Sequence, residues 1–199
     1  MLNDAVLKLK GETTEEEEFE TSIDLSVDAF IPNTYIKSEY IKLDMYKRIS
    51  CIESVEEYSD MQEELEERFG QIPQAAENLL RIALLKSDAH KAYISQIIQK
   101  SDGIRFYMHS GRKSDPQKIK EMVELYDGKM KFISAEEPYF LYKLRSEEEV
   151  KTAVTGIYSP RLKTNTKKKV LTSDDIFHIV EGVIKNIGDS VKGDSHEEK

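Results

Sequence analysis

The 199-residue chain holds 38 acidic and 29 basic residues, a net charge of −9, and 39% hydrophobic residues, enough for one sizeable core or two small ones. Its longest apolar runs, such as 82–85, stop far short of the roughly 20 residues that a membrane-spanning helix needs, which excludes a membrane protein. No secretory signal pattern follows Met1. Because Cys51 is the only cysteine, no intrachain disulfide is possible, and we expect a cytoplasmic location.

The charge is unevenly distributed along the chain. Residues 1–100 carry 11 basic and 21 acidic residues, whereas residues 101–199 carry 18 and 17. Affinity for nucleic-acid phosphates comes from Lys and Arg, so an acidic chain disfavours nonspecific duplex binding. Any contact with nucleic acid must therefore be local.

The N-terminal part predicts a short amphipathic helix over 1–11, an acidic linker over 12–21 and an alternating strand over 22–27. Three helices then follow. The first, over 36–49, is expected to bury Ile36, Tyr40, Leu43 and Ile49. The second begins at Ser54 and ends before Gly70, and the third, over 74–91, is apolar over much of its surface, which predicts a central helix.

The Asp102-Gly103 turn predicts a hairpin from strands 93–99 and 104–109. A helix over 115–126, strands over 130–134 and 139–144, and a helix over 147–158 follow. A basic loop over 159–169 precedes a last helix, which a capping box at 172–175 begins. This mixture predicts an α+β fold, with a small mixed or antiparallel sheet packed with several helices in a single compact domain over 22–190, and a disordered tail over 191–199.

Catalytic and metal-binding patterns are absent from the sequence. No Gly-x-Gly pair occurs, and 111–114 resembles only the tail of a phosphate-binding loop. The four histidines, His90, His109, His178 and His196, have no ligand-like spacing. Cys51 is expected to be a buried, inert thiol. We therefore predict no catalytic residue, no metal and no cofactor; a hydrolase with carboxylates in a cleft is the third hypothesis.

An acidic face on the helix over 54–69 is the strongest functional signal. At 100° per residue, one narrow arc holds Glu57, Asp60, Glu64 and Glu67. A solvated helix face is the simplest interpretation. However, almost no basic residue between positions 53 and 67 relieves the repulsion, and such a face suits an arginine-rich partner.

A basic segment supports a second hypothesis. Residues 143–169 carry eight basic and three acidic residues, and the candidate nucleic-acid contacts are Lys163, Lys167, Lys168 and Lys169. Without interleaved aromatic residues, a solubilising loop is the simpler interpretation.

Several phrases in order connect the chain to a known family. They are Asp-Ala-Phe-Ile-Pro at 28–32, Tyr-Lys-Arg-Ile at 46–49, Glu-Leu-Glu-Glu-Arg-Phe-Gly at 64–70 with Pro73, and Asn-Leu-Leu at 78–80 leading to Ala-Leu-Leu-Lys at 83–86. Together they resemble the C-terminal (TRCF) domain of the bacterial transcription-repair coupling factors, the Mfd family. Residues 1–11 are similar to the end of the translocase motor that precedes this domain, and the resemblance covers 1 to about 145.

The resemblance implies a non-catalytic fragment of an ATP-dependent DNA translocase that displaces stalled RNA polymerase and recruits nucleotide excision repair. In that family the C-terminal domain docks on a UvrB-like N-terminal module and covers the surface that recruits UvrA, which implies autoinhibition. The family's acidic contacts match Glu64 and Glu67 here, with Glu57 and Asp60 flanking them. RNA polymerase, UvrA and DNA would be partners only through the parent protein.

Overall fold

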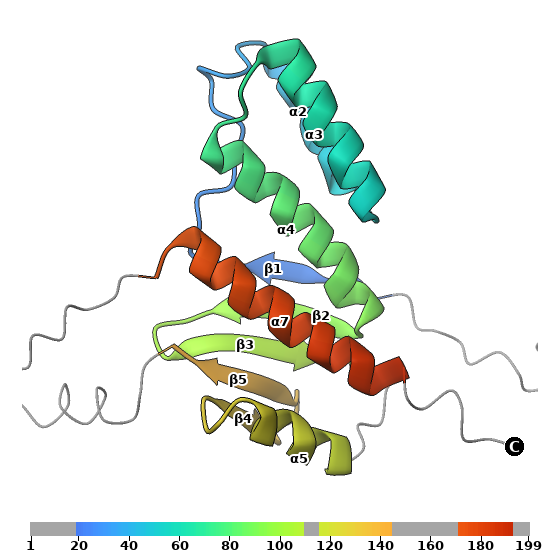
Figure 1. Ribbon diagram of the computed structural model, residues 1–199, viewed down its shortest axis with the longest axis vertical. Helices are drawn as coiled ribbons and strands as arrows, with labels where there is room; N and C mark the ends of the chain where they lie inside the picture. Colours follow the sequence, from blue (N-terminus) through green and yellow to red (C-terminus); the bar gives the residue numbers. More distant parts are fainter. Residues whose placement is uncertain (1–18, 110–115, 145–170, 193–199) are drawn as a thin grey trace, which may run out of the picture.

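The computed structural model describes residues 19–109, 116–144 and 171–192, and shows an α+β fold (Figure 1). A five-stranded sheet has the order β1-β2-β3-β5-β4, in which β1 runs parallel to β2 and the other neighbours are antiparallel. The strands are β1 (Ser22–Asp24), β2 (Ile94–Gln99), β3 (Gly103–Met108), β4 (Met130–Ile133) and β5 (Tyr139–Lys143). The helices are α2 (Glu39–Ser50), α3 (Val55–Phe69), α4 (Gln74–Lys91), α5 (Pro116–Leu125) and α7 (Ser173–Lys192).

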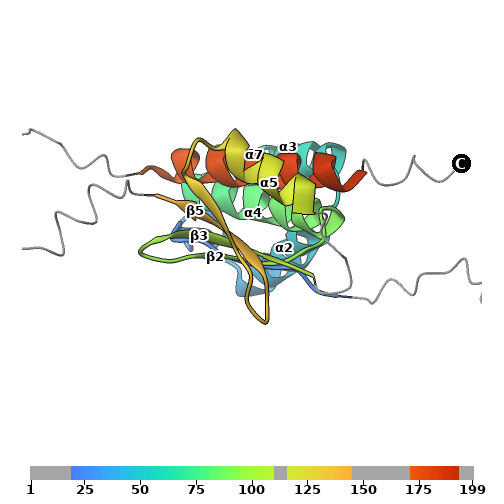
Figure 2. The ribbon, with the colours of Figure 1, turned by 90° about the horizontal axis from the view of Figure 1, so that it is seen from below.

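The helices form two groups. Helices α4, α5 and α7 cover one face of the sheet (Figure 2), whereas α2 and α3 lie side by side beyond the β1 edge and pack on α4 (Figure 1). Within residues 19–109, 116–144 and 171–192, no helix covers the other face of the sheet (Figure 2). The predicted α+β class with a mixed sheet is confirmed.

Two apolar cores share α4. The first lies between the sheet, α5 and α7, and includes Leu85, Phe106 and Phe177. The second lies among α2, α3 and the N-terminal half of α4, and includes Leu65 and Leu80. Because α4 contributes buried residues to both cores, the prediction of a central third helix is confirmed.

The prediction for the first helix needs two corrections. Helix α2 begins at Glu39, since the Ser38 hydroxyl caps it by accepting from the Ile41 N–H at 3.4 Å. Its buried residues are Lys42, Met45 and Ile49, whereas Tyr40 and Leu43 are 84% and 56% exposed. The side of α2 that becomes buried is the side that contacts α3 and α4. The positions of the apolar residues alone predicted a different side.

The predicted hairpin forms, with Lys100 N–H donating to the Gly103 carbonyl at 2.8 Å. The predicted capping box is confirmed as well: Thr172 N–H donates to Asp175 Oδ2 at 2.9 Å, and Asp175 N–H donates to Thr172 Oγ1 at 3.2 Å. Strand β1 is shorter than predicted, and α7 extends further, to Lys192. The helices expected over 1–11 and 147–158, and the loop over 159–169, lie outside the described residues.

None of the described helices combines the length and the apolar composition that crossing a bilayer requires.

Candidate docking site

Helix α3 carries the acidic face that the sequence singles out. Ser54 caps it, with its hydroxyl accepting from the Glu57 N–H at 3.2 Å, and Gly70 ends it at φ 82°, a conformation that glycine adopts without strain. Met61 and Leu65 are buried against the second core. The rest of the helix surface carries seven acidic residues and one basic residue, so the solvent-facing side of α3 is strongly negative.

Glu64 is not free on this face, because two arginines hold its carboxylate. Arg48, from α2, forms a bidentate pair with it, in which Nη1 lies 2.6 Å from Oε1 and Nη2 contacts Oε2. Arg68, one turn further along α3, donates to Oε1 at 2.6 Å. The hydrogen bond from Arg48, joined by that from Arg68, lowers the pKa of Glu64 to about 2 despite its partial burial. The expectation that almost no base relieves this face is therefore wrong at Glu64.

Glu57 also has a structural role. Its Oε2 accepts from the Glu53 N–H at 2.7 Å, so the carboxylate closes the first turn of α3 together with Ser54. Because this bond fixes the carboxylate at the start of the helix, Glu57 is a helix-capping group first.

Asp60 and Glu67 are the two remaining predicted residues, and both are exposed. Within 19–109, 116–144 and 171–192, neither has an ion-pair partner. The structure therefore divides the four predicted residues into two that are engaged within the chain and two that face solvent.

Arg48 is the site residue that sequence reasoning missed. It lies 16 positions before Glu64 on another helix, and only the packing of α2 on α4 beside α3 brings it close. The Arg68 contact, in contrast, was readable from the sequence, because residues at i and i+4 face each other on a helix.

Cys51 is exposed at the C-terminal end of α2, so the expectation of a buried thiol is wrong. Ile49 and Ile52 on either side fill the second core, whereas Ser50 and Cys51 between them are exposed. His90 and His109 are distant in sequence, but both stack on the Phe19 ring, with centroid distances of 4.4 and 4.3 Å. Across the part of the chain that the structure describes, no three candidate ligands gather in a way that could hold a metal ion.

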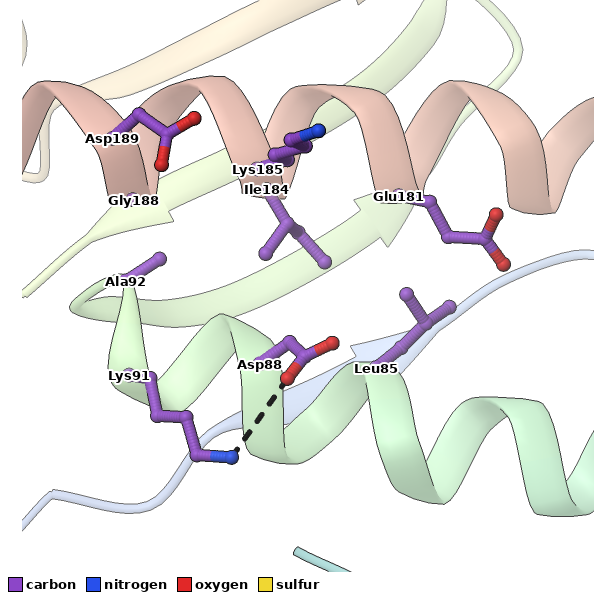
Figure 3. A pocket seen from close by; sticks show the side chains of 9 residues that line it. All are labelled: Leu85, Asp88, Lys91, Ala92, Glu181, Ile184, Lys185, Gly188 and Asp189. Carbon is purple, nitrogen blue, oxygen red and sulfur yellow. Dashed lines mark ion pairs between the residues drawn. The ribbon is translucent and has the colours of Figure 1, made fainter. Parts of the chain in front are cut away.

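A hollow of about 360 Å³ lies between α4 and α7 (Figure 3). Leu85 and Ile184 point into it, while Asp88 and Lys91 form an ion pair of 3.8 Å at its side. None of the predicted site residues lines this hollow. The predicted nucleic-acid contacts Lys163, Lys167, Lys168 and Lys169 lie outside the described residues.

In a comparison with known protein families, residues 25–119 match the family described as "TRCF domain". A transcription-repair-coupling factor of Bacillus subtilis is 37% identical over 128 residues, which are 63% of this chain and 11% of that protein. The corresponding protein of Rickettsia typhi is 30% identical over 147 residues, 72% of this chain and 13% of that protein. The chain thus spans little more than a tenth of these relatives.

A solved structure has a similar fold. The crystal structure of a C-terminal domain of transcription-repair coupling factor superposes with a TM-score of 0.60 at 22% identity, covering 91% of this chain and 97% of that one. The acidic helix and the sheet described above therefore belong to a fold already seen in such a domain.

Proposed function

Because this chain carries a TRCF domain over residues 25–119, we propose that it acts as a non-catalytic, autoinhibitory interaction domain of a transcription-repair coupling factor. The acidic face of α3 docks on the UvrB-like N-terminal module of the parent protein and masks the surface that recruits UvrA. The parent is an ATP-dependent DNA translocase that displaces stalled RNA polymerase. UvrA, RNA polymerase and DNA are partners of the parent and not of this face.

The observation that carries the proposal is the pair of exposed carboxylates, Asp60 and Glu67, beside a glutamate that already binds arginine. The bidentate contact of Arg48 with Glu64 within the chain supports an arginine as the partner's group. A guanidinium on a partner can form the same charge-assisted bonds with Glu67. Glu67 and Asp60 therefore make the first contacts, and Glu64 joins when Arg48 or Arg68 shares its carboxylate.

The strength of this docking suits a reversible clamp. Exposed ion pairs contribute only about 0.2 to 1 kcal/mol each, so a few of them hold the two modules together mainly because both belong to one chain. A rearrangement of the parent that costs the contact a few kcal/mol is then enough to release it.

The test is a titration of this chain against the separately purified UvrB-like module, with binding followed by calorimetry at two salt concentrations. We expect salt-sensitive binding by the native sequence. The Glu64→Arg plus Glu67→Arg variant should lose at least about tenfold in affinity, because two attractive contacts become repulsive.

The matched control is Glu136→Arg plus Glu137→Arg, which makes the same charge change at exposed positions between β4 and β5. This control should bind like the native chain. Equal losses in both double variants would mean that net charge, and not the α3 face, drives association. Undiminished binding by the α3 variant, with its circular dichroism unchanged, would refute the docking site.

A further inference from the structure

One face of the sheet has no cover in the described part of the chain. Helices α4, α5 and α7 all pack on the opposite face (Figure 2). The strand registers pair Ile98 with Arg105, Arg105 with Leu141, and Leu141 with Lys131 across β2, β3, β5 and β4. The next row pairs Gln96, Tyr107, Tyr139 and Ile133 in the same way. These eight residues form what we name the open face.

The open face is unusually apolar for a sheet surface that no described helix covers. An antiparallel sheet with one solvated side ordinarily alternates apolar inward and polar outward residues. Here five of the eight outward positions are apolar or aromatic, namely Ile98, Tyr107, Ile133, Tyr139 and Leu141, and none of them packs against the first core. A contiguous apolar area of this kind marks an interaction surface.

Two tyrosines and an arginine form the centre of the open face. The rings of Tyr107 and Tyr139 lie side by side with centroids 4.9 Å apart. The Arg105 guanidinium lies 5.5 Å from the Tyr139 centroid and donates to Asp102 at 2.9 Å. Its Nε–H is buried and has no acceptor among the described residues. The centre therefore combines two aromatic rings with a guanidinium group.

The charge on this side is positive although the chain as a whole carries −9. Arg105 and Lys131 belong to the open face, and Lys143 extends it along β5, opposite Gly103. Two acidic side chains offset these cations in part, namely Asp24 on the edge strand β1 and Asp102, which pairs with Arg105. Strand β5 also leads directly into the most basic segment of the sequence, 143–169. An anionic partner is thus favoured over an arginine-rich one.

We propose that the open face binds single-stranded nucleic acid, with bases stacked on Tyr107 and Tyr139 and phosphates contacting Arg105, Lys131 and Lys143. Aromatic rings within a basic surface are the combination by which single strands are held, because every base presents a π-face and every nucleotide a phosphate. A duplex hides its bases and would meet only the cations, so single strands bind more tightly. This activity is separate from docking through α3, which lies beyond the β1 edge (Figure 1).

The experiment is fluorescence anisotropy of the 199-residue chain with labelled oligothymidylate and oligouridylate of about twelve nucleotides and a duplex of the same length. We expect both single strands to bind, more tightly than the duplex, with affinity that falls as salt rises. Tyr107→Ser plus Tyr139→Ser should weaken single-strand binding at least about tenfold, because base stacking on both rings is lost. Tyr40→Ser, which removes an 84% exposed tyrosine from α2, is the matched control and should change nothing.

A second variant keeps the proposal testable if the double tyrosine variant does not fold. Lys131→Gln, at an exposed position, should weaken binding severalfold and reduce the salt dependence by about one phosphate contact. Absence of single-strand binding by the native chain would overturn the proposal. The proposal would also fail if the tyrosine and Lys131 variants bound as tightly as the native chain while a variant with Lys167, Lys168 and Lys169 changed to Gln lost binding. That result would place the nucleic-acid contact on the basic segment. Self-association that the tyrosine variant abolishes, without oligonucleotide binding, would assign the face to protein contacts instead.

Discussion

At the scale of single residues, the Glu64 carboxylate shows how a surface group becomes structural. It joins α2 to α3 through Arg48 and is also bonded to Arg68. The pKa of Glu64, about 2 in the folded protein, lies below its ordinary value of 4.5. A carboxyl group whose pKa is lowered by folding stabilises the native state above its unfolded pKa, and this contribution is lost as the pH falls.

We predict that Glu64→Gln lowers the free energy of unfolding by about 1 kcal/mol at pH 7, since it weakens two partly exposed ion pairs. The difference between the variant and the native chain should shrink as the pH falls from 4.5 towards 2, where Glu64 itself becomes protonated. Urea unfolding at a series of pH values, followed by circular dichroism, measures both effects.

Glu67→Gln is the matched control for this experiment. Glu67 is exposed and has no ion pair in the described part of the chain. The same chemical change there should leave the free energy of unfolding within about 0.5 kcal/mol of the native value. If both variants lost equal stability, or if the Glu64→Gln difference persisted at pH 2, the arginine contacts would not be the cause.

At the scale of elements, α7 is fastened to α4 by one arginine. Arg81 of α4 donates to Asp174 at 2.7 Å and to Glu181 at 2.9 Å, and its guanidinium lies 4.2 Å from the Phe177 ring centroid. Phe177 is fully buried in the first core. One side chain therefore joins the polar and the apolar contacts between the two helices.

We predict that Arg81→Ala destabilises the protein by about 2 kcal/mol, because it removes two charge-assisted hydrogen bonds and the cation–π contact from a side chain that is 19% exposed. Lys86→Ala, at an exposed position of the same helix, should cost less than about 0.5 kcal/mol. Urea unfolding of both variants measures these losses of stability. If the free energies of unfolding of the two variants differed by less than about 0.5 kcal/mol, which is near the error of the method, the role given to Arg81 would be contradicted.

At the scale of the whole molecule, α4 couples the two cores. Leu80 fills the second core, while Leu85 and Ala89 fill the first. A helix cannot lose the packing along one half without weakening the other, because its backbone hydrogen bonds form cooperatively. The two cores should therefore unfold together.

We predict that Leu65→Ala, which leaves a cavity in the second core at a side chain with 0% exposure, destabilises the protein by about 3 kcal/mol. Hydrogen exchange should show the same loss of protection for amides of β2 and β3, far from the substitution, as for those of α2 and α3. Unchanged protection in the sheet would show instead that the α2–α3 part opens independently.

Local patterns in the sequence were sufficient for most elements. The alternation at 22–27, the Asp102-Gly103 turn, the Thr172 capping box and the apolar stripe of α7 each depend on residues within a few positions of one another, although only 22–24 of the first forms a strand. Short-range backbone geometry decides such features. The acidic arc of α3 was visible for the same reason, since its residues repeat at helical spacing.

Only the tertiary structure decided which groups meet. It exposed Tyr40 and Cys51, placed Arg48 on Glu64, and set Arg105 beside Tyr139 on a sheet face that no described helix covers. Each of these depends on contacts between elements far apart in the chain, and helical or strand periodicity is the same whichever neighbour a face meets. The sequence by itself therefore determined most elements and their polar faces, whereas packing determined which of those faces meet another described element and which do not.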